Sequence, residues 1–116
     1  MLFHVVLFRP RADLSAAERA GLVAALEAAL GRIPSIRRFS LGRRIRHGAR
    51  YESLMQADLG YGAVLEFDDL AGLQAYLGDP AHAALGTRFT ESVEASAIYD
   101  YQVQDREDLR RLARGG

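Results

Sequence analysis

The sequence contains no cysteine and carries no excess of charge of either sign. Without cysteine there is no disulfide, no thiolate nucleophile and no zinc site built on sulfur, and a reducing cytoplasm is the expected location. The 15 basic side chains equal the 15 acidic ones, so no net charge attracts a nucleic acid or an anionic membrane. We therefore expect neither as a partner.

The N-terminal apolar stretch, residues 1–8, is too short to span a bilayer and lacks the basic region and cleavage site of a signal peptide. Its valines and phenylalanines, stopped by Arg9-Pro10, favour a β-strand. A chain of 116 residues is the usual size of one domain. We expect that domain to cover residues 1–103 and to be followed by a charged tail, residues 104–116.

Capping patterns mark two helix starts. Ser15 and Glu18 have the spacing of a capping box, and Asp79-Pro80 places an N-cap before a proline in the first turn. Gly31 is positioned to end the first helix. Leucine spacing predicts helices over 15–31, over 68–77, and a short one from 79 through 89. The expected buried stripe of the second helix is Leu70, Leu73 and Leu77.

The expected strands alternate with these helices in a specific order. Their residues are 1–8, 36–45, 61–67 and 97–103. The order strand, helix, strand, strand, helix, strand is the βαββαβ pattern of ferredoxin-like α+β folds, in which the helices lie on one face of the sheet.

The first strand is apolar on both faces, with Phe3, Val5 and Leu7 on one and Val6 and Phe8 on the other. The third strand also has apolar side chains on both faces, which is typical of a sheet covered on both sides. The chain has no further segment for the second face. We therefore expect an identical subunit to cover it, so that two sheets pack face to face in a homodimer.

A basic segment separates the second and third strands. Residues 43–60 contain Arg43, Arg44, Arg46 and Arg50, with glycines and no clear periodicity, and predict a long flexible loop. The charges form either a solvated cluster or a surface that attracts an anionic ligand.

Three polar rings are candidates for chemistry. His82 follows Asp79 in the first helical turn, where the helix dipole disfavours imidazolium, so a neutral base is expected. Tyr76 borders the apolar stripe of its helix and can donate a hydrogen bond to an oxyanion. His4 interrupts an apolar strand and needs a partner if buried. The alternative is that all three rings are structural.

An ordered set of motifs resembles the stress-responsive A/B barrel (Dabb) family over about residues 2–103. The motifs are His4-Val-Val-Leu-Phe8, Gly60-Tyr61, Tyr76-Leu-Gly-Asp-Pro-Ala-His82 and Tyr99-Asp-Tyr101. The resemblance implies a dimeric α+β barrel with one ferredoxin-like sheet from each subunit. It also implies a small-molecule pocket in which His4, Tyr61 and Phe8 contact the ligand.

One plant member of that family is a polyketide cyclase that closes a linear thioester by aldol condensation. This sequence is similar at its functional positions, which implies catalytic roles for Tyr76 and His82, with His4 as the matching strand histidine. The third strand differs, because Ala63 stands where the cyclase has a histidine. The resemblance therefore implies the class of reaction but does not imply the substrate.

Three functions remain open at the level of sequence. The first is acid-base chemistry on a small apolar carbonyl compound by Tyr76 and His82, with no cofactor. The second is a non-catalytic, stress-associated role in binding or assembly. The third is a monooxygenase-like dimeric barrel, inferred from fold alone. No required metal is predicted, because the three histidines lack ligand spacing.

Overall fold

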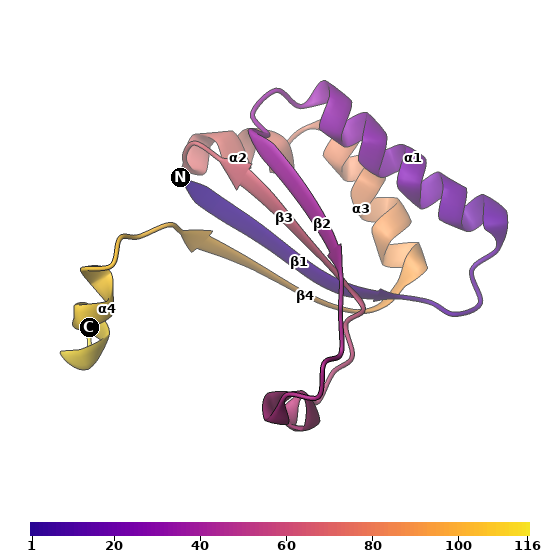
Figure 1. The fold of residues 1–116 in the computed structure, drawn as a ribbon. Helices are drawn as coiled ribbons and strands as arrows, with labels where there is room; N and C mark the ends of the chain where they lie inside the picture. Colours follow the sequence, from indigo (N-terminus) through magenta and orange to yellow (C-terminus); the bar gives the residue numbers. More distant parts are fainter.

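The computed structural model describes residues 1–116 and contains one four-stranded antiparallel sheet (Figure 1). The strands are β1 (Leu2–Pro10), β2 (Arg38–Arg43), β3 (Tyr61–Phe67) and β4 (Val93–Gln102). They are ordered β2-β3-β1-β4, and β1 pairs antiparallel with both β3 and β4. This is the ferredoxin-like α+β arrangement, so the predicted fold class is confirmed.

Helices α1 (Ala16–Arg32), α2 (Leu70–Leu77) and α3 (Pro80–Ser92) all lie on one face of the sheet (Figure 1). Both predicted caps are present. The Ser15 side chain accepts from the Glu18 backbone N–H while the Glu18 carboxylate accepts from the Ser15 backbone N–H. Asp79 accepts from the Ala81 backbone N–H at the start of α3. These caps fix where the two long helices begin.

Two helix ends differ from the prediction. Helix α1 continues through Gly31 to Arg32, and Ile33 forms the C-cap in an extended conformation. Only Gly48 and Gly115 have a positive φ, so Gly31 does not end the helix by a left-handed turn. Helix α3 has 13 residues and leads directly into β4 at Val93, so the helix is longer and the strand starts earlier than expected.

The buried stripe predicted for α2 was partly wrong. Leu73 is buried, but Leu70 and Leu77 are exposed and Tyr76 is buried instead. The helix has only 8 residues, and it meets the core through one pair spaced by three positions. Tyr76 therefore belongs to the core as well as to the candidate site.

The filled core is confined to one end of the sheet. Phe67 is fully buried there, with Leu65, Leu73, Tyr76 and Ile33 around it. In total only 11 of 116 residues are buried. One reason is that the helix-covered face towards the other end of β1 is hollow.

The second face of the sheet carries no helix (Figure 1). Val5 on β1 is flanked there by Val64 on β3 and Tyr99 on β4, which are its register partners. Phe3 and Tyr101 extend the same surface. The apolar pattern predicted for both faces is therefore present, and one apolar face has no cover within the chain.

The basic segment predicted as a flexible loop is ordered by contacts within itself. A 3-10 helix, η1 (Arg50–Leu54), lies at its tip, and the segment projects beyond the sheet (Figure 1). Asp58 pairs with Arg44 at 2.7 Å and with Arg46 at 3.0 Å. Because its own carboxylates neutralise part of its charge, the segment is less suited to attract an anion than its arginines suggest.

The tail also projects. After β4 the chain leaves the sheet and ends in α4 (Asp108–Ala113), away from the other helices (Figure 1). The two projections give a radius of gyration of 16.3 Å. A compact chain of this length would have about 13 Å. No helix in the structure is both long enough and apolar enough to span a membrane.

Candidate functional site

A cavity of about 690 Å³ lies between the sheet and the helices α1 and α3. Of its 22 lining residues, 15 are hydrophobic. A volume of this size and a mostly apolar lining with a few polar groups are typical of sites for small molecules. The cavity occupies the part of the helix-covered face that the core leaves unfilled.

The leucines of α1 line this cavity instead of filling it. Leu22 and Leu26 are only partly buried, and both face the hollow. On the opposite wall, Gly86 of α3 has no atom within 4 Å of where a Cβ would stand. The absence of a side chain at Gly86 therefore keeps that wall open.

His4 has the partner that its burial requires. The residue is 6% exposed, and its Nδ1 lies 2.6 Å from Oδ1 of Asp100, the residue directly opposite on β4. A carboxylate only accepts, so Nδ1 of His4 is the donor in either protonation state. This bond fixes the ring orientation and leaves Nε2 for the cavity.

Tyr76 lies between the two histidines. Its ring centroid is 5.6 Å from that of His4 and 4.6 Å from that of His82, both edge-on. The residue is 4% exposed, and burial raises the pKa of its phenol to about 12. The Tyr76 hydroxyl makes no hydrogen bond to another protein group. Ser35 Oγ is the one fully buried side-chain polar atom without a partner, so the Tyr76 hydroxyl is not fully buried and opens onto the cavity that Tyr76 lines. It is a protonated donor at neutral pH.

His82 lies in the first turn of α3 and lines the same cavity. Its pKa is lowered from the usual value, first by burial and second by the charge of His4. The Leu77 backbone and the Asp79 carboxylate oppose this shift. Burial and a neighbouring positive charge both disfavour imidazolium, so a neutral ring is favoured at pH 7.

Phe8 and Tyr61, the other two residues expected in the pocket, form an aromatic wall away from the histidines. Their rings stack with centroids 5.4 Å apart and an interplanar angle of 17°. Phe89 of α3 packs edge-on against Phe8 at the same distance. All five site residues inferred from the sequence thus line one cavity, with the polar rings at one end and this wall further along β1.

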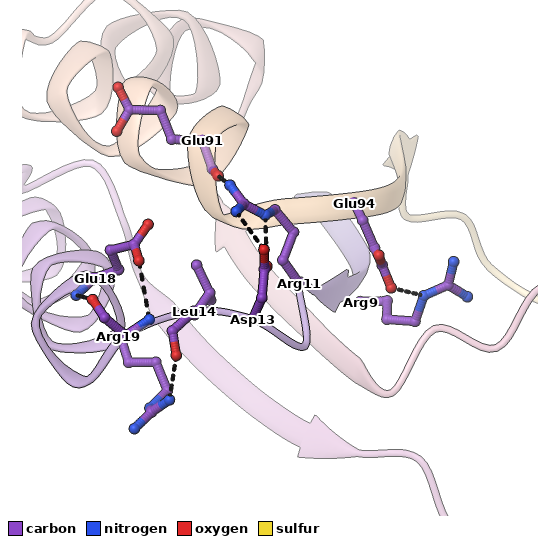
Figure 2. A network of polar contacts seen from close by, with 9 residues as sticks. Arg9, Arg11, Asp13, Leu14, Glu18, Arg19, Glu91 and Glu94 are labelled. Carbon is purple, nitrogen blue, oxygen red and sulfur yellow. Dashed lines mark hydrogen bonds and ion pairs between the residues drawn. The ribbon is translucent and has the colours of Figure 1, made fainter.

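Two arginines at the mouth were not singled out from the sequence. Arg11 makes three hydrogen bonds within the protein, two to Asp13 at 3.0 Å and one to the Glu91 carbonyl at 2.9 Å (Figure 2). Arg19 donates only to the Leu14 carbonyl, at 2.7 Å (Figure 2). Both line the cavity, and no Asp or Glu does.

The sequence also does not identify Asp100 as the partner of His4, although Asp100 lies within the Tyr99-Asp-Tyr101 motif. Its role depends on facing His4, and that follows from the pairing of β1 with β4. Arg19 could have been found, because it precedes Leu22 and Leu26 at helical spacing and so shares their stripe. No group of three or more side chains suited to hold a metal ion is present.

Comparison with known families places this fold and cavity in context. The model of the Stress Responsive A/B Barrel Domain (Dabb) matches residues 2–103. The chain belongs to this family. The resemblance to this family that was inferred from the motifs is therefore confirmed. Helix α4 lies outside the residues that the family model matches. None of the curated proteins matches the chain.

Solved structures share the fold of this A/B barrel domain at low identity. A Dabb family protein from Mesorhizobium loti is 23% identical, with a TM-score of 0.69 over 90% of this chain and 97% of that one. A hydroxynitrile lyase from Passiflora edulis is 15% identical, with a TM-score of 0.73 over 90% and 94%. A cofactor-independent oxygenase from Streptomyces nogalater is 18% identical, with a TM-score of 0.64 over 90% and 93%. At these identities the likeness shows the fold alone.

Several neighbours of this A/B barrel domain are described as dimers. One, a ferredoxin-like protein from Thermobifida fusca, is 18% identical, with a TM-score of 0.66 over 88% of this chain and 90% of that one. Others come from Bacteroides fragilis and a Jannaschia species. Dimers of this fold are therefore known among proteins whose sheets match this one.

Proposed function

We propose that this A/B barrel domain is a cofactor-independent enzyme that removes a proton next to the carbonyl group of a small, mostly apolar compound. The observation that carries the proposal is the contact of Tyr76 with both His4 and His82 at one end of a single apolar cavity. A pocket with convergent polar groups and shifted pKa values is the usual form of an acid-base site.

His82 is the base in this proposal. Its lowered pKa keeps a ring nitrogen unprotonated at neutral pH. That nitrogen takes the proton from the carbon, and the electron pair of the broken C–H bond moves onto the carbonyl oxygen as an enolate.

Tyr76 stabilises the enolate oxygen. With a pKa of about 12 the phenol stays protonated, so it donates a hydrogen bond to the oxygen on which charge develops. The chain has no lysine, so no lysine side chain can form a Schiff base with the ligand carbonyl and thereby accept the negative charge of the enolate. In this proposal the hydrogen bond from Tyr76 therefore makes the main contribution to lowering the activation barrier of proton removal.

Asp100 is a positioning residue that acts through His4. The bond of 2.6 Å between them turns the second ring nitrogen of His4 towards the bound carbonyl compound. There it can donate a hydrogen bond to a second polar group of the ligand and so orient the group that reacts with the enolate. In a ligand with a second carbonyl, attack by the enolate forms a new carbon-carbon bond while the π bond of that carbonyl breaks, which is the aldol closure that the family resemblance implies. The alkoxide that results takes up the proton that His82 removed.

The proposal is tested by hydrogen-deuterium exchange at carbons next to carbonyls, followed by NMR in D₂O over a panel of ketones and thioesters. We expect the wild type to speed exchange for at least one apolar ligand. Gly86→Leu should abolish it by filling the cavity, without loss of melting temperature, since leucine also favours the helix.

Gly31→Leu is the matched control, because Gly31 lies in α1, is exposed and does not line the cavity. If ligands bind and Gly86→Leu displaces them, yet no exchange is catalysed, the cavity serves binding and the catalytic proposal is wrong. Oxygen uptake in the same samples would instead favour the monooxygenase-like alternative.

We also infer that the uncovered sheet face is the interface of a homodimer. The face is apolar around Val5, Val64 and Tyr99, and several neighbours of the same fold are dimers. Burying such a face against its copy removes apolar surface from water on both sides.

Val5→Arg places a charge at the centre of this face and is expected to convert the dimer into a monomer. Sedimentation equilibrium measures the mass directly. Leu70→Arg is the control, because Leu70 is also apolar and is exposed, but it lies on α2 and not on this face. A wild type that sediments as a monomer would overturn the inference.

A further inference from the structure

We propose that Arg19 binds the carboxylate of the ligand, so that the compound held in the cavity is an amphiphilic acid. This inference rests on the proposed ligand-binding role of the cavity and names the class of its ligand. It places an anionic group at the mouth and an apolar chain along the interior.

The charges that line the cavity are all of one sign. Its ionisable lining residues are two histidines, two tyrosines and two arginines, and no carboxylate is among them. Arg19 is exposed at the mouth, while the interior beyond it is lined mostly by apolar side chains. An anionic group at the mouth would pair with Arg19, and a neutral ligand would leave Arg19 to water.

Arg19 is the arginine free to make that contact. Three of the donors of Arg11 are already used by Asp13 and the Glu91 carbonyl (Figure 2). Arg19 uses one, on the Leu14 carbonyl, and pairs with no carboxylate (Figure 2). That single bond holds the guanidinium at the mouth, and the remaining donors match the two oxygens of a carboxylate.

The stripe of α1 continues from Arg19 into the cavity through Leu22 and Leu26. A carboxylate on Arg19 would therefore direct an attached chain along the apolar wall. This arrangement joins the charged mouth to the apolar interior along one helix.

The distance to the polar rings sets the length of the chain. Arg11, in the segment that leads into α1, bonds the Glu91 carbonyl at the end of α3, whereas His82 lies in the first turn of α3. The helical rise between His82 and Glu91 amounts to about 13 Å. An extended chain covers that distance with about ten bonds. A medium-chain acid with its carbonyl at the far end would reach both His82 and Arg19.

Calorimetric titration with octanoate and with 1-octanol tests this inference without any turnover. We expect the wild type to bind octanoate about tenfold more tightly than the alcohol, as suits one charge-assisted contact. Arg19→Gln should remove that preference while the alcohol binds as before. Higher salt should weaken binding of octanoate only.

Arg32→Gln is the matched control, since Arg32 lies on the same helix and outside the cavity. Equal affinities for the two ligands in the wild type, an unchanged preference in folded Arg19→Gln, or no binding of either ligand would each overturn the inference. Its failure is separate from that of the catalytic proposal, because exchange on a neutral ketone can persist without any preference for octanoate, and octanoate can bind without catalysis.

Discussion

His82→Asn is expected to slow exchange at the ligand carbon by about 10²- to 10⁴-fold, the usual contribution of a general base. Asparagine keeps a polar group of similar size in the first turn of α3 but cannot take up the proton. The melting temperature should change little, because the histidine is only partly buried. Exchange rates by NMR and thermal melting measure the two effects separately.

His47→Asn is the control for this loss. His47 is on the projecting segment, where it contacts the Tyr51 hydroxyl at 2.9 Å, and it does not line the cavity. The variant should exchange at the rate of the wild type. If His82→Asn kept the full rate, another group would have to be the base.

The pH profile identifies the base independently. Because burial and the His4 charge lower the pKa of His82, the neutral form persists below pH 6.5, and the rate falls only as the pH drops further. On the alkaline side the Tyr76 phenol stays protonated up to about pH 12. The wild-type rate should therefore be flat from neutral to moderately alkaline pH. Any residual exchange catalysed by His82→Asn should not show this fall in rate at acid pH.

The βαββαβ order was predictable because its local determinants are strong. Residues 61–67 were predicted as a strand, and β3 has the same bounds. The capping box at Ser15 placed the start of α1 correctly. Helix ends were harder, as Gly31 shows, because a glycine without a left-handed φ leaves the helix free to continue to Arg32.

The hollow interior could not be read from the pattern of leucines. Leu22 and Leu26 recur at the spacing of a core stripe, and the same spacing serves a stripe that packs and one that lines a cavity. Which occurs depends on how far α1 stands from the sheet, a tertiary property. The small side chain of Ala63 and the absence of one at Gly86 help to keep the space open.

The site was predictable as far as the family resemblance named its residues. Its polar support was not, because the contact of His4 with Asp100 joins positions 96 residues apart through strand register. Tyr76 was expected at the border of its stripe and is instead among the most buried residues. A core position that also presents a hydroxyl to the cavity has two roles, and local sequence does not distinguish them.

Tyr76→Phe removes one oxygen and is expected to slow exchange by about 10²- to 10³-fold, the usual loss of one oxyanion donor. The ring contacts with Phe67, His4 and His82 stay, since phenylalanine fills the same space. No protein group loses a hydrogen bond, so the free energy of unfolding should change by less than about 0.5 kcal/mol. This separation of rate from stability distinguishes a donor to the ligand from a structural tyrosine.

Chemical denaturation and NMR exchange on the same samples measure this separation, and Tyr51→Phe makes the same chemical change outside the cavity. A structural hydroxyl would give the opposite result, with lowered stability and an exchange rate close to that of the wild type. If Tyr76→Phe altered neither quantity, the enolate would have to be stabilised by His4, whose second ring nitrogen Asp100 turns to the same end of the cavity. Asp100→Asn would then slow exchange more than Tyr76→Phe does, which the proposed roles do not predict.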